Sequence, residues 1–338
     1  MSPQIIGLDI GGANLKAATP EGEAASVEFP LWKHPAELVS RLRQLVQTLP
    51  KADRIAVTMS GEMCDCFETR EEGVEFIVAS VAKAFPDADR SFWSNACEFV
   101  PSDSASQNLE SIASANWSAQ AEWATRFVEG RDAFLIDCGS TTTDIVPWRS
   151  GAPCWAGRND YERLRNSELV YTGCRRTPVA MIDSECQCAE LFATMQDVWM
   201  ILGEIPEEPD NYNTADNRAA TIANSRKRLA RMNGIDYHRM DPVAFQNEVE
   251  QKARMQESII ANALKHVMDR TGMVPEVIML SGSGEFLARR AIVRYTTTVD
   301  FQPLEEARLI SLNEMLGPKV SECACAYAVA VLAEEAGQ

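Results

Sequence analysis

Short apolar runs alternate along the chain with longer segments in which apolar residues recur every three or four positions. The short runs predict buried strands at 5–9, 55–59, 134–137 and 277–280. The longer segments predict helices at 36–49, 191–202, 245–268, 286–292 and 320–335. Because strands and helices alternate in this way, we expect an α/β fold with a mostly parallel or mixed sheet covered by helices.

Two further segments have a distinctive composition. The segment 103–127 is rich in Ala and Ser, with Trp117 and Trp123 at helical spacing, and it predicts one long packed helix. The segment 206–220 is polar and rich in turn-forming residues, which predicts a surface loop.

An internal repeat connects the two halves of the chain. Residues 8–17 align without gaps on residues 136–145, and both segments predict a strand, a tight turn and a second strand. The alignment pairs four positions: Asp9 with Asp137, Gly11 with Gly139, Asn14 with Thr142, and Lys16 with Asp144. A duplicated hairpin with an Asp at the end of its first strand predicts two similar lobes that face each other across a ligand cleft.

The repeat also suggests where the two lobes divide. We expect residues 1–105 and 318–338 to form the N-terminal lobe. Residues 106–317 then form the C-terminal lobe, with a helical insertion around 186–255. At 338 residues, the chain is long enough for each lobe to bury a core of its own.

Charge and hydropathy narrow the functional class. The formal net charge of −17 argues against a nucleic-acid partner or an anionic membrane surface. No run approaches the roughly 18 apolar residues of a membrane span, and no basic region precedes an apolar one at the N-terminus. We therefore expect a cytoplasmic protein.

The ten cysteines do not predict a disulfide framework or a zinc site. Cys138 falls in a predicted core strand, and in a large acidic chain such residues are usually buried reduced thiols. Three Cys-x-Cys pairs lack the usual zinc-finger spacing: Cys64/Cys66, Cys186/Cys188 and Cys323/Cys325.

The two Asp residues of the repeat suit phosphate chemistry. A carboxylate at the tip of a buried strand is unfavourable unless a cation or hydrogen-bond donors satisfy it. If Asp9 and Asp137 converge across a cleft, they are natural ligands for Mg²⁺ together with substrate phosphate. Lys16 would neutralise the outer phosphate as a point charge. The alternative is that each Asp only caps a tight hairpin, which two copies with a shared pattern make less attractive.

The turns that follow these Asp residues carry candidate phosphate contacts. Backbone N–H groups and polar side chains there can cradle phosphate oxygens, at Gly11, Gly12, Asn14, Gly139, Ser140, Thr141 and Thr142. A third loop, with Gly282, Ser283 and Gly284, follows a strand and precedes a helix. Such a loop is usually a simple turn, but in a phosphate-binding protein it is a plausible anion or nucleotide contact.

These motifs resemble those of a known superfamily. Residues 9–16 and 137–144 are similar to the two phosphate loops of the actin/sugar-kinase/heat-shock-chaperone superfamily, and 280–284 is similar to its nucleotide loop. Residues 105–117 and 320–335 resemble its two connecting helices. The Asp-x-Gly-Ser-Thr-Thr-Thr-Asp form is closest to the hydantoinase A/oxoprolinase branch. The resemblance implies a ribonuclease H-like, actin-like ATPase fold.

Further stretches resemble a short subgroup of this branch. They are residues 58–63, 65–70, 113–117, 171–173, 176–179, 192–194, 197–198 and 214–216. The subgroup is associated with tetrahydromethanopterin-linked one-carbon transfer and includes the ether-forming synthase of methanofuran biosynthesis. The resemblance implies a transferase that joins a furanylmethyl diphosphate to the phenol of a tyramine- or tyrosine-glutamate acceptor and releases diphosphate. Mg²⁺ at Asp9 and Asp137, with Lys16, would stabilise the leaving diphosphate.

Several polar residues are candidates for the remaining roles. Asp144 and Glu62 are both candidates for the general base that takes the phenol proton, and the sequence does not choose between them. Arg70 and Arg176 are candidates for binding substrate carboxylate or phosphate, although Arg is also common in surface ion pairs. For Tyr171 and Trp148, core packing is favoured over stacking on substrate.

Two other functions stay open from the sequence. The first is an ATP-dependent kinase or hydantoinase/oxoprolinase-like enzyme, which would bind ATP. The second is a non-catalytic ligand-binding protein of the same pathway. The sequence determines neither the acceptor nor the oligomeric state.

Overall fold

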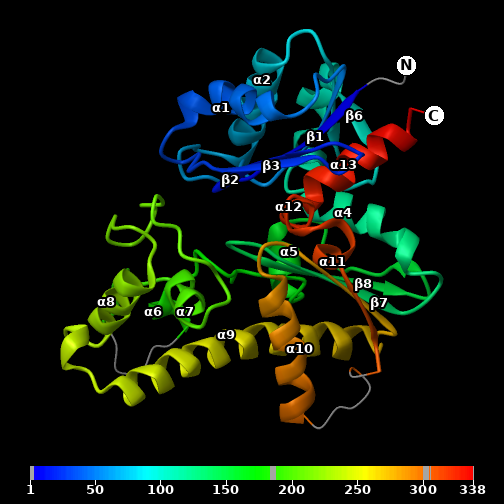
Figure 1. The fold of residues 1–338 in the computed structure, drawn as a ribbon. Coiled ribbons are helices and arrows are strands. Elements are labelled where there is room, and N and C mark those ends of the chain that lie inside the picture. Colours follow the sequence, from blue (N-terminus) through cyan, green and yellow to red (C-terminus); the bar gives the residue numbers. More distant parts are fainter. Residues whose placement is uncertain (1–3, 183–187, 300–303, 305, 338) are drawn as a thin grey trace.

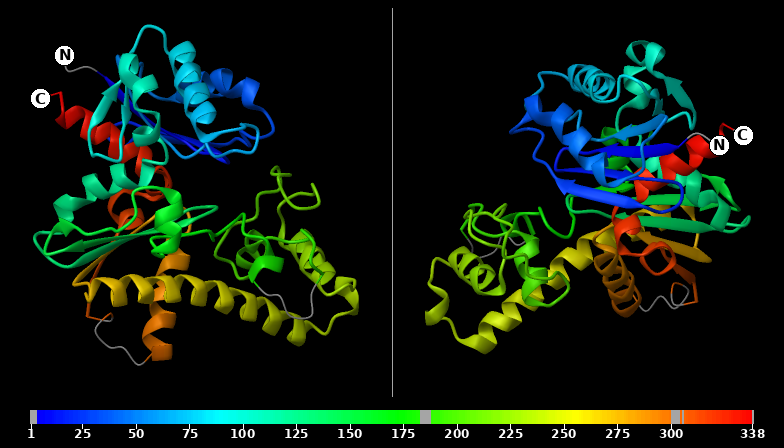
Figure 2. Two further views of the ribbon diagram at one scale, coloured as in Figure 1. Left: turned by 180° about the vertical axis from the view of Figure 1, so that it is seen from behind. Right: turned by 45° about the horizontal axis from the view of Figure 1, so that its top comes forward.

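The computed structural model describes residues 4–182, 188–299, 304 and 306–337. It has two lobes, each built on a six-stranded mixed sheet (Figure 1). The chain starts in the upper lobe of that view and builds the lower lobe. It then returns through its last helix, which lies between the two sheets (Figure 2).

The sheet of the first lobe has the strand order β3-β2-β1-β4-β5-β6. The strands are β1 (Ile5–Ile10), β2 (Asn14–Ala18), β3 (Ala24–Glu28), β4 (Arg54–Met59), β5 (Asp89–Trp93) and β6 (Phe99–Pro101). Strand β1 runs antiparallel to β2 and parallel to β4. Helices α1 (Leu38–Leu45) and α2 (Arg70–Ala84) contribute buried residues to the core of this lobe.

The sheet of the second lobe repeats this arrangement, with the order β10-β8-β7-β11-β12 and β9 paired to β8. The strands are β7 (Ala133–Cys138), β8 (Thr143–Arg149), β9 (Ala152–Pro153), β10 (Leu169–Val170), β11 (Val277–Ser281) and β12 (Arg308–Ser311). Strand β7 runs antiparallel to β8 and parallel to β11, as β1 does to β2 and β4. The two similar lobes predicted from the repeated hairpin are confirmed.

Two helices rich in small residues separate the sheets. Helix α13 (Ala324–Glu335) packs against β1, β4 and α4 (Asn116–Ala124). The approach is so close that a Cβ atom on Gly7 would lie 2.0 Å from the carbonyl oxygen of Ala326. Trp117 and Trp123 of α4 join the core on the facing side of the second sheet. The small side chains therefore let both sheets share one helical layer.

The expectation of one long helix over 103–127 is wrong. This segment comprises the 3-10 turn Ser102–Gln107, α3 (Leu109–Ile112), α4 and a second 3-10 turn at Thr125–Phe127. Between α3 and α4, Ser114 has a φ of 46°, which interrupts the helix. The segment 320–335 is likewise broken at Cys323, between α12 (Pro318–Glu322) and α13. Ala- and Ser-rich composition favours helix, but tertiary contacts of Ser114 override it.

A helical region extends to one side of the second lobe. It contains α6 (Val179–Ile182), α7 (Met195–Ile201), α8 (Ile222–Met232) and the long α9 (Pro242–Thr271). One end of α9 lies beneath the second sheet with α10 (Glu285–Val299), and its other end carries α7 and α8 (Figures 1 and 2). The loop between α7 and α8 rises from this region toward the first lobe. The remaining elements are α5 (Asp160–Arg165), α11 (Leu312–Leu316) and the 3-10 turns Pro35–Glu37, Val46–Thr48 and Tyr237–Arg239.

Two expectations from composition concern the whole chain. The nine cysteines in the described residues are free thiols, while Cys186 of the pair with Cys188 lies outside those residues. In the part of the chain that the structure describes, no helix combines the length and apolar character needed to cross a bilayer.

Candidate active site

The first hairpin places Asp9 opposite Lys16 in the antiparallel register of β1 and β2. Asp9 is 6% exposed, and its Oδ1 atom has no hydrogen-bond partner among the described residues. Burial raises the pKa of Asp9 to about 6; Lys16 opposes this rise, whereas Asp137 and Glu62 add to it. Burial alone would lower the pKa of Lys16, but Asp9 and other nearby acidic groups hold it above its usual value. The hairpin thus places a buried carboxyl group near the opposite charge of Lys16.

The second hairpin places Asp137 opposite Asp144 and beside Ser281 of β11. Asp137 Oδ1 accepts a hydrogen bond from Ser281 Oγ at 2.5 Å, and Ser281 Oγ in turn accepts one from Gln120 Nε2 at 2.6 Å. Burial raises the pKa of Asp137, while the Ser281 hydrogen bond and the charge of Lys16 act against the rise. The Asp137 carboxylate therefore has a hydrogen-bond donor at Oδ1, whereas Oδ1 of Asp9 has none among the described residues.

Asp144 occupies the repeat position of Lys16 but has a different role in the fold. It forms an ion pair of 2.6 Å with Arg163 Nη1, and the Arg163 guanidinium lies 4.0 Å from the centroid of the Trp117 ring. Burial raises the pKa of Asp144 to about 6, and Arg163 opposes the rise. Asp144 is thus the ion-pair partner of a buried arginine.

The two predicted phosphate turns face each other directly. Asn14 Nδ2 donates a hydrogen bond of 3.1 Å to Ser140 Oγ, across 126 positions of sequence. Each turn is closed by a matching backbone bond, from Gly11 N–H to Asn14 O at 3.0 Å and from Gly139 N–H to Thr142 O at 2.9 Å. The structure therefore brings together the predicted contacts of both lobes: Gly11, Gly12, Asn14, Gly139, Ser140, Thr141 and Thr142.

The third predicted loop packs against the end of β7. Gly282 has a φ of 89°, and a Cβ atom there would lie 2.3 Å from the carbonyl oxygen of Cys138. A Cβ atom on Gly284 would lie 2.6 Å from Cys138 Sγ. Between them, Ser283 Oγ lies 3.6 Å from Cys174 Sγ. Close packing therefore explains both glycines, and it brings this loop to Asp137.

Glu62 lies just beyond β4, on the side of the first lobe that faces the second. It is 1% exposed, and its Oε1 atom lies 2.6 Å from Ser114 Oγ and 3.5 Å from Arg70 Nη2. Its Oε2 atom has no hydrogen-bond partner among the described residues. Burial raises the pKa of Glu62. Arg70, the first residue of α2, thus faces Glu62.

The predicted arginines contact different groups. Arg176 of the second lobe lies over the ring of Trp32 in the first lobe, with the guanidinium 4.4 Å from the centroid. Its neighbour Arg175 forms a bidentate pair with Glu208, at 2.7 and 3.1 Å. Arg176 therefore lies at the junction of the lobes, and Arg175 holds the loop after α7.

Core packing is the wrong expectation for one of the two aromatic candidates. Tyr171 is 67% exposed, whereas Trp148 is fully buried and donates from Nε1 to Thr125 Oγ1 at 3.2 Å. Tyr171 precedes Gly173, where a Cβ atom would lie 2.5 Å from the backbone nitrogen of Thr141. The chain after Tyr171 is thus pressed against the second phosphate turn, which leaves the Tyr171 ring in solvent.

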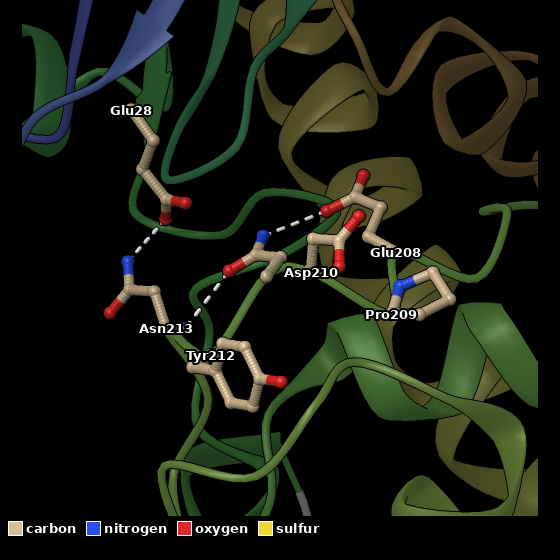
Figure 3. A pocket seen from close by; sticks show the side chains of 7 residues that line it. Glu28, Glu208, Pro209, Asp210, Tyr212 and Asn213 are labelled. Atoms are coloured by element: carbon tan, nitrogen blue, oxygen red, sulfur yellow. Dashed lines mark hydrogen bonds between the residues drawn. The ribbon is translucent and has the colours of Figure 1, made fainter.

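An open pocket of about 640 Å³ lies between β3 and the loop after α7 (Figure 3). It is lined by Glu28 of β3 and by residues 208–213 of the loop after α7. Glu28 is opposite Asn14 in the sheet, and Asn213 Nδ2 donates a hydrogen bond to its carboxylate. The pocket contains none of the predicted site residues. However, it shows that the predicted surface loop bridges the two lobes.

The residues around Asp9 fit a divalent metal only in part. No group of three or more His, Cys, Asp and Glu side chains that could hold a metal occurs in the described part of the chain. Asp9 and Asp137 provide two carboxylates, and the unpartnered Oδ1 of Asp9 is an open oxygen ligand. This donor set suits Mg²⁺ that completes its coordination with water and substrate phosphate.

Sequence reasoning missed three residues that the fold brings to the site. Trp32 lies beneath Arg176, and Ser114 and Asp160 are hydrogen-bonded to each other at 3.0 Å beside Glu62. Ser114 lies inside a motif of the resembling subgroup, but nothing in local spacing connects it with Asp160. A contact of this kind is visible only in three dimensions.

Comparison with known proteins gives the family. Residues 53–297 match the hydantoinase/oxoprolinase family model. A relative from Methanocaldococcus jannaschii is named (4-{4-[2-(gamma-L-glutamylamino)ethyl]phenoxymethyl}furan-2-yl)methanamine synthase. It is 30% identical over 351 aligned residues, covering 99% of each chain. A protein of the same name from Methanococcus vannielii is 27% identical over 220 residues, covering 63% of this chain and 95% of its own.

A solved structure supports the fold. The nucleotide-free structure of acetone carboxylase aligns with a TM-score of 0.56 and 10% identity, over 97% of this chain and 70% of that one. Together with the repeated strand order, this likeness confirms the predicted fold class. The chain belongs to the hydantoinase/oxoprolinase family and is a full-length relative of the furan-methanamine synthase of Methanocaldococcus jannaschii.

Proposed function

We propose that this protein is a transferase of methanofuran biosynthesis that forms the aryl ether bond between a furanylmethyl group and the phenol of a glutamyl-tyramine acceptor. The observation that carries the proposal is the 30% identity over the full length of a relative whose name describes a phenoxymethyl-furan product. The facing hairpins of Asp9 and Asp137 support it, because ether formation needs a site for a charged leaving group.

The leaving group in this proposal is diphosphate. The bond between the furanylmethyl carbon and the diphosphate oxygen breaks, and its electron pair leaves with diphosphate. The furan ring stabilises the positive charge that develops on the methylene carbon. The phenol oxygen then forms the new bond to that carbon, and its proton passes to a base. The enzyme therefore has to stabilise an anion and accept a proton.

The two phosphate turns are suited to the anion. Lys16 carries its charge opposite Asp9, and the turns at 11–14 and 139–142 meet at the Asn14–Ser140 bond, where their remaining backbone N–H groups would be donors for phosphate oxygens. Mg²⁺ held by Asp9 and Asp137 would supply further positive charge when bound. Arg176 is exposed at the same junction, where it is available for a phosphate or carboxylate of a substrate.

Glu62 is a better general base than Asp144. One oxygen of Asp144 is held by Arg163 at 2.6 Å. Glu62 Oε2, in contrast, has no hydrogen-bond partner among the described residues, and burial raises the pKa of Glu62, which makes it a stronger base than an exposed carboxylate. We therefore assign the phenol proton to Glu62.

Under this proposal, the protein is a cytoplasmic enzyme that acts on small-molecule substrates in tetrahydromethanopterin-linked one-carbon metabolism.

The test of the proposal is incubation of the purified protein with a synthetic aminomethyl-furanylmethyl diphosphate, γ-glutamyl-tyramine and Mg²⁺. We expect ether product by mass spectrometry and one diphosphate for each ether formed. Diphosphate release without ether would contradict the proposal, as would turnover that requires ATP. Adenine-nucleotide binding by calorimetry addresses the ATP-dependent alternative directly.

A further inference from the structure

A single hydroxyl group lies between two carboxyl groups of opposite lobes. Ser114 Oγ is 2.6 Å from Glu62 Oε1 and 3.0 Å from Asp160 Oδ2. A serine hydroxyl carries one proton and can donate only one of these two hydrogen bonds. When both contacts are full hydrogen bonds, the other one is donated by a carboxyl group. The three groups therefore share two protons, and one of the carboxyl groups is a neutral acid.

The difference in exposure points to Glu62 as the protonated group. Glu62 is 1% exposed, whereas Asp160 is only partly buried, and desolvation disfavours the charged form of the more deeply buried carboxyl group. Among the described residues, the charged groups that face Glu62 are Arg70 at 3.5 Å, Asp160 beyond the Ser114 hydroxyl, and Asp9, and the titratable groups of Cys64 and Tyr171 also interact with it. Asp160 and Asp9 are carboxylates, which disfavour a further negative charge. Asp160, at the start of α5, is only partly buried and keeps contact with solvent.

The backbone of Ser114 supports a role for its hydroxyl. Ser114 has a φ of 46°, in the left-handed region that favours glycine. Its side chain is buried, and its two contacts bridge the lobes. A residue held in an unfavourable backbone conformation at a site is a reason to seek a function for its side chain.

We propose that Glu62, Ser114 and Asp160 form a proton relay that prepares Glu62 as the general base. This inference rests on the proposed function. The proton on Glu62 Oε1 passes to Ser114 Oγ while the Ser114 proton passes to Asp160 Oδ2. Glu62 is then a carboxylate, and its unpartnered Oε2 accepts the phenol proton as the ether bond forms. Asp160 releases its proton to solvent, and rotation of the Glu62 carboxyl group brings the proton taken from the phenol back to the side of Ser114. One proton therefore leaves in each turnover and the starting state is restored.

The relay depends on the relative position of the lobes. Glu62 follows β4 of the first lobe, Ser114 precedes α4 between the lobes, and Asp160 begins α5 of the second. A proton path between Glu62 and solvent therefore exists only while these three segments are in contact. The basicity of Glu62 therefore depends on the same relative position of the two lobes that brings the two phosphate turns together.

The first test is Ser114→Gly, because glycine removes the hydroxyl and accepts the left-handed backbone without strain. We expect kcat to fall by about a hundredfold, the usual scale of general-base catalysis, with KM for the diphosphate little changed. The acidic limb of the pH profile of kcat should move to higher pH, because the Ser114 hydrogen bond lowers the pKa of Glu62 in the native protein. Unchanged kcat and pH profile would overturn the relay.

The chain offers a matched control and a second variant. Ser150 is exposed and also left-handed, with a φ of 49°, so Ser150→Gly should leave the kinetics unchanged. Asp160→Asn removes the acceptor at the end of the relay, so kcat should fall as in Ser114→Gly. Its acidic limb should not move to higher pH, because the asparagine no longer repels the Glu62 carboxylate. An upward shift in both variants would indicate general damage to the site.

A measurement without turnover separates the relay from the proposed reaction. Infrared spectroscopy of the ligand-free protein at the pH of the activity assay should show a carbonyl band of a neutral carboxylic acid that disappears in Glu62→Gln and persists in Ser150→Gly. Absence of that band from the native protein would overturn the relay, whatever the activity. If the band is present but the native protein forms no ether, the proposed function fails and the protonated Glu62 stands.

Discussion

At the scale of single residues, the site contains carboxylates whose burial opposes folding. Asp9 is the clearest example, because its Oδ1 has no donor among the described residues and its pKa is about 6 instead of 3.8. A raised pKa means that the folded chain binds the proton more tightly than the unfolded chain does. Ionisation of Asp9 therefore destabilises the fold as pH rises from about 4 to about 6, and the full penalty is present above that window.

Asp9→Asn should accordingly separate stability from activity. Without metal at pH 7, we expect the variant to be more stable than the native protein by up to about 3 kcal/mol in urea unfolding, since each pKa unit corresponds to about 1.4 kcal/mol. The gain should vanish below about pH 4, where Asp9 is protonated in both states. Ether formation should fall by about a hundredfold or more. A variant that is less stable at pH 7 would contradict this account of Asp9.

Replacement of Arg163 should lower the free energy of unfolding, the opposite of the effect expected for Asp9→Asn. The Arg163 side chain is 1% exposed, and it pairs with Asp144 at 2.6 Å. Arg163→Met keeps much of the apolar stem but leaves Asp144 as an unpaired buried charge, so we expect a loss of about 3–5 kcal/mol in the free energy of unfolding. Arg165→Met, on the exposed face of the same helix α5, is the matched control and should change it by less than about 0.5 kcal/mol. Equal losses would show that the Arg163 pair contributes nothing specific.

At the scale of elements, the layer between the sheets depends on small residues. Gly7 of β1 faces α13, where an added Cβ atom would lie 2.0 Å from Ala326 O and 2.9 Å from Ala330 Cβ. The backbone oxygen cannot move away without shifting the helix. The small residues that face each other here, Gly7 on β1 and Ala326 and Ala330 on α13, therefore decide how closely α13 can approach the first sheet.

Gly7→Ala should destabilise the protein although glycine is a weak strand former. We expect a loss of about 1–3 kcal/mol, the usual result of overpacking, measured by thermal and urea unfolding. Gly139→Ala is a control for stability alone. The atom nearest to an added Cβ there would be Thr142 O at 3.6 Å, which is an ordinary contact distance. If Gly7→Ala unfolds like the native protein, the close approach of α13 is not a constraint.

At the scale of the whole molecule, the ligand site is made by the junction of two lobes. The Asn14–Ser140 bond, the Trp32–Arg176 stack and the Asn213–Glu28 bond all join them. A ligand that contacts both phosphate turns should therefore stabilise this arrangement by mass action. Inorganic diphosphate with Mg²⁺ is a simple probe, because it lacks the furan and the acceptor.

We expect Mg²⁺ and diphosphate together to raise the melting temperature more than the sum of their separate effects. At a concentration about 100 times the dissociation constant, the stabilisation should approach about 2.7 kcal/mol. The joint effect should be lost in the Asp9→Asn/Asp137→Asn double variant, and sulfate at matched ionic strength should not replace it. An equal joint effect in the double variant would place the metal elsewhere.

The sequence alone determined the features that depend on local pattern. The hairpin repeat predicted two lobes and aligned Asp9 with Asp137, because strand periodicity and a shared Asp-x-Gly turn are readable within ten residues. Residues 245–268 predicted much of α9 for the same reason. The Ala- and Ser-rich segment 103–127 misled that reasoning, since helix propensity contains no information about the contacts of Ser114.

Only the tertiary structure decided which charges meet. Ser114 reaches Glu62 across 52 positions and Asp160 across 46, and Arg163 rather than a substrate group neutralises Asp144. Such contacts depend on how two sheets pack around α4 and α13, and burial at that junction sets the pKa values of Asp9 and Glu62. Local pattern identifies residues capable of chemistry. Desolvation and long-range pairing, which exist only in the folded chain, determine which of them hold a proton.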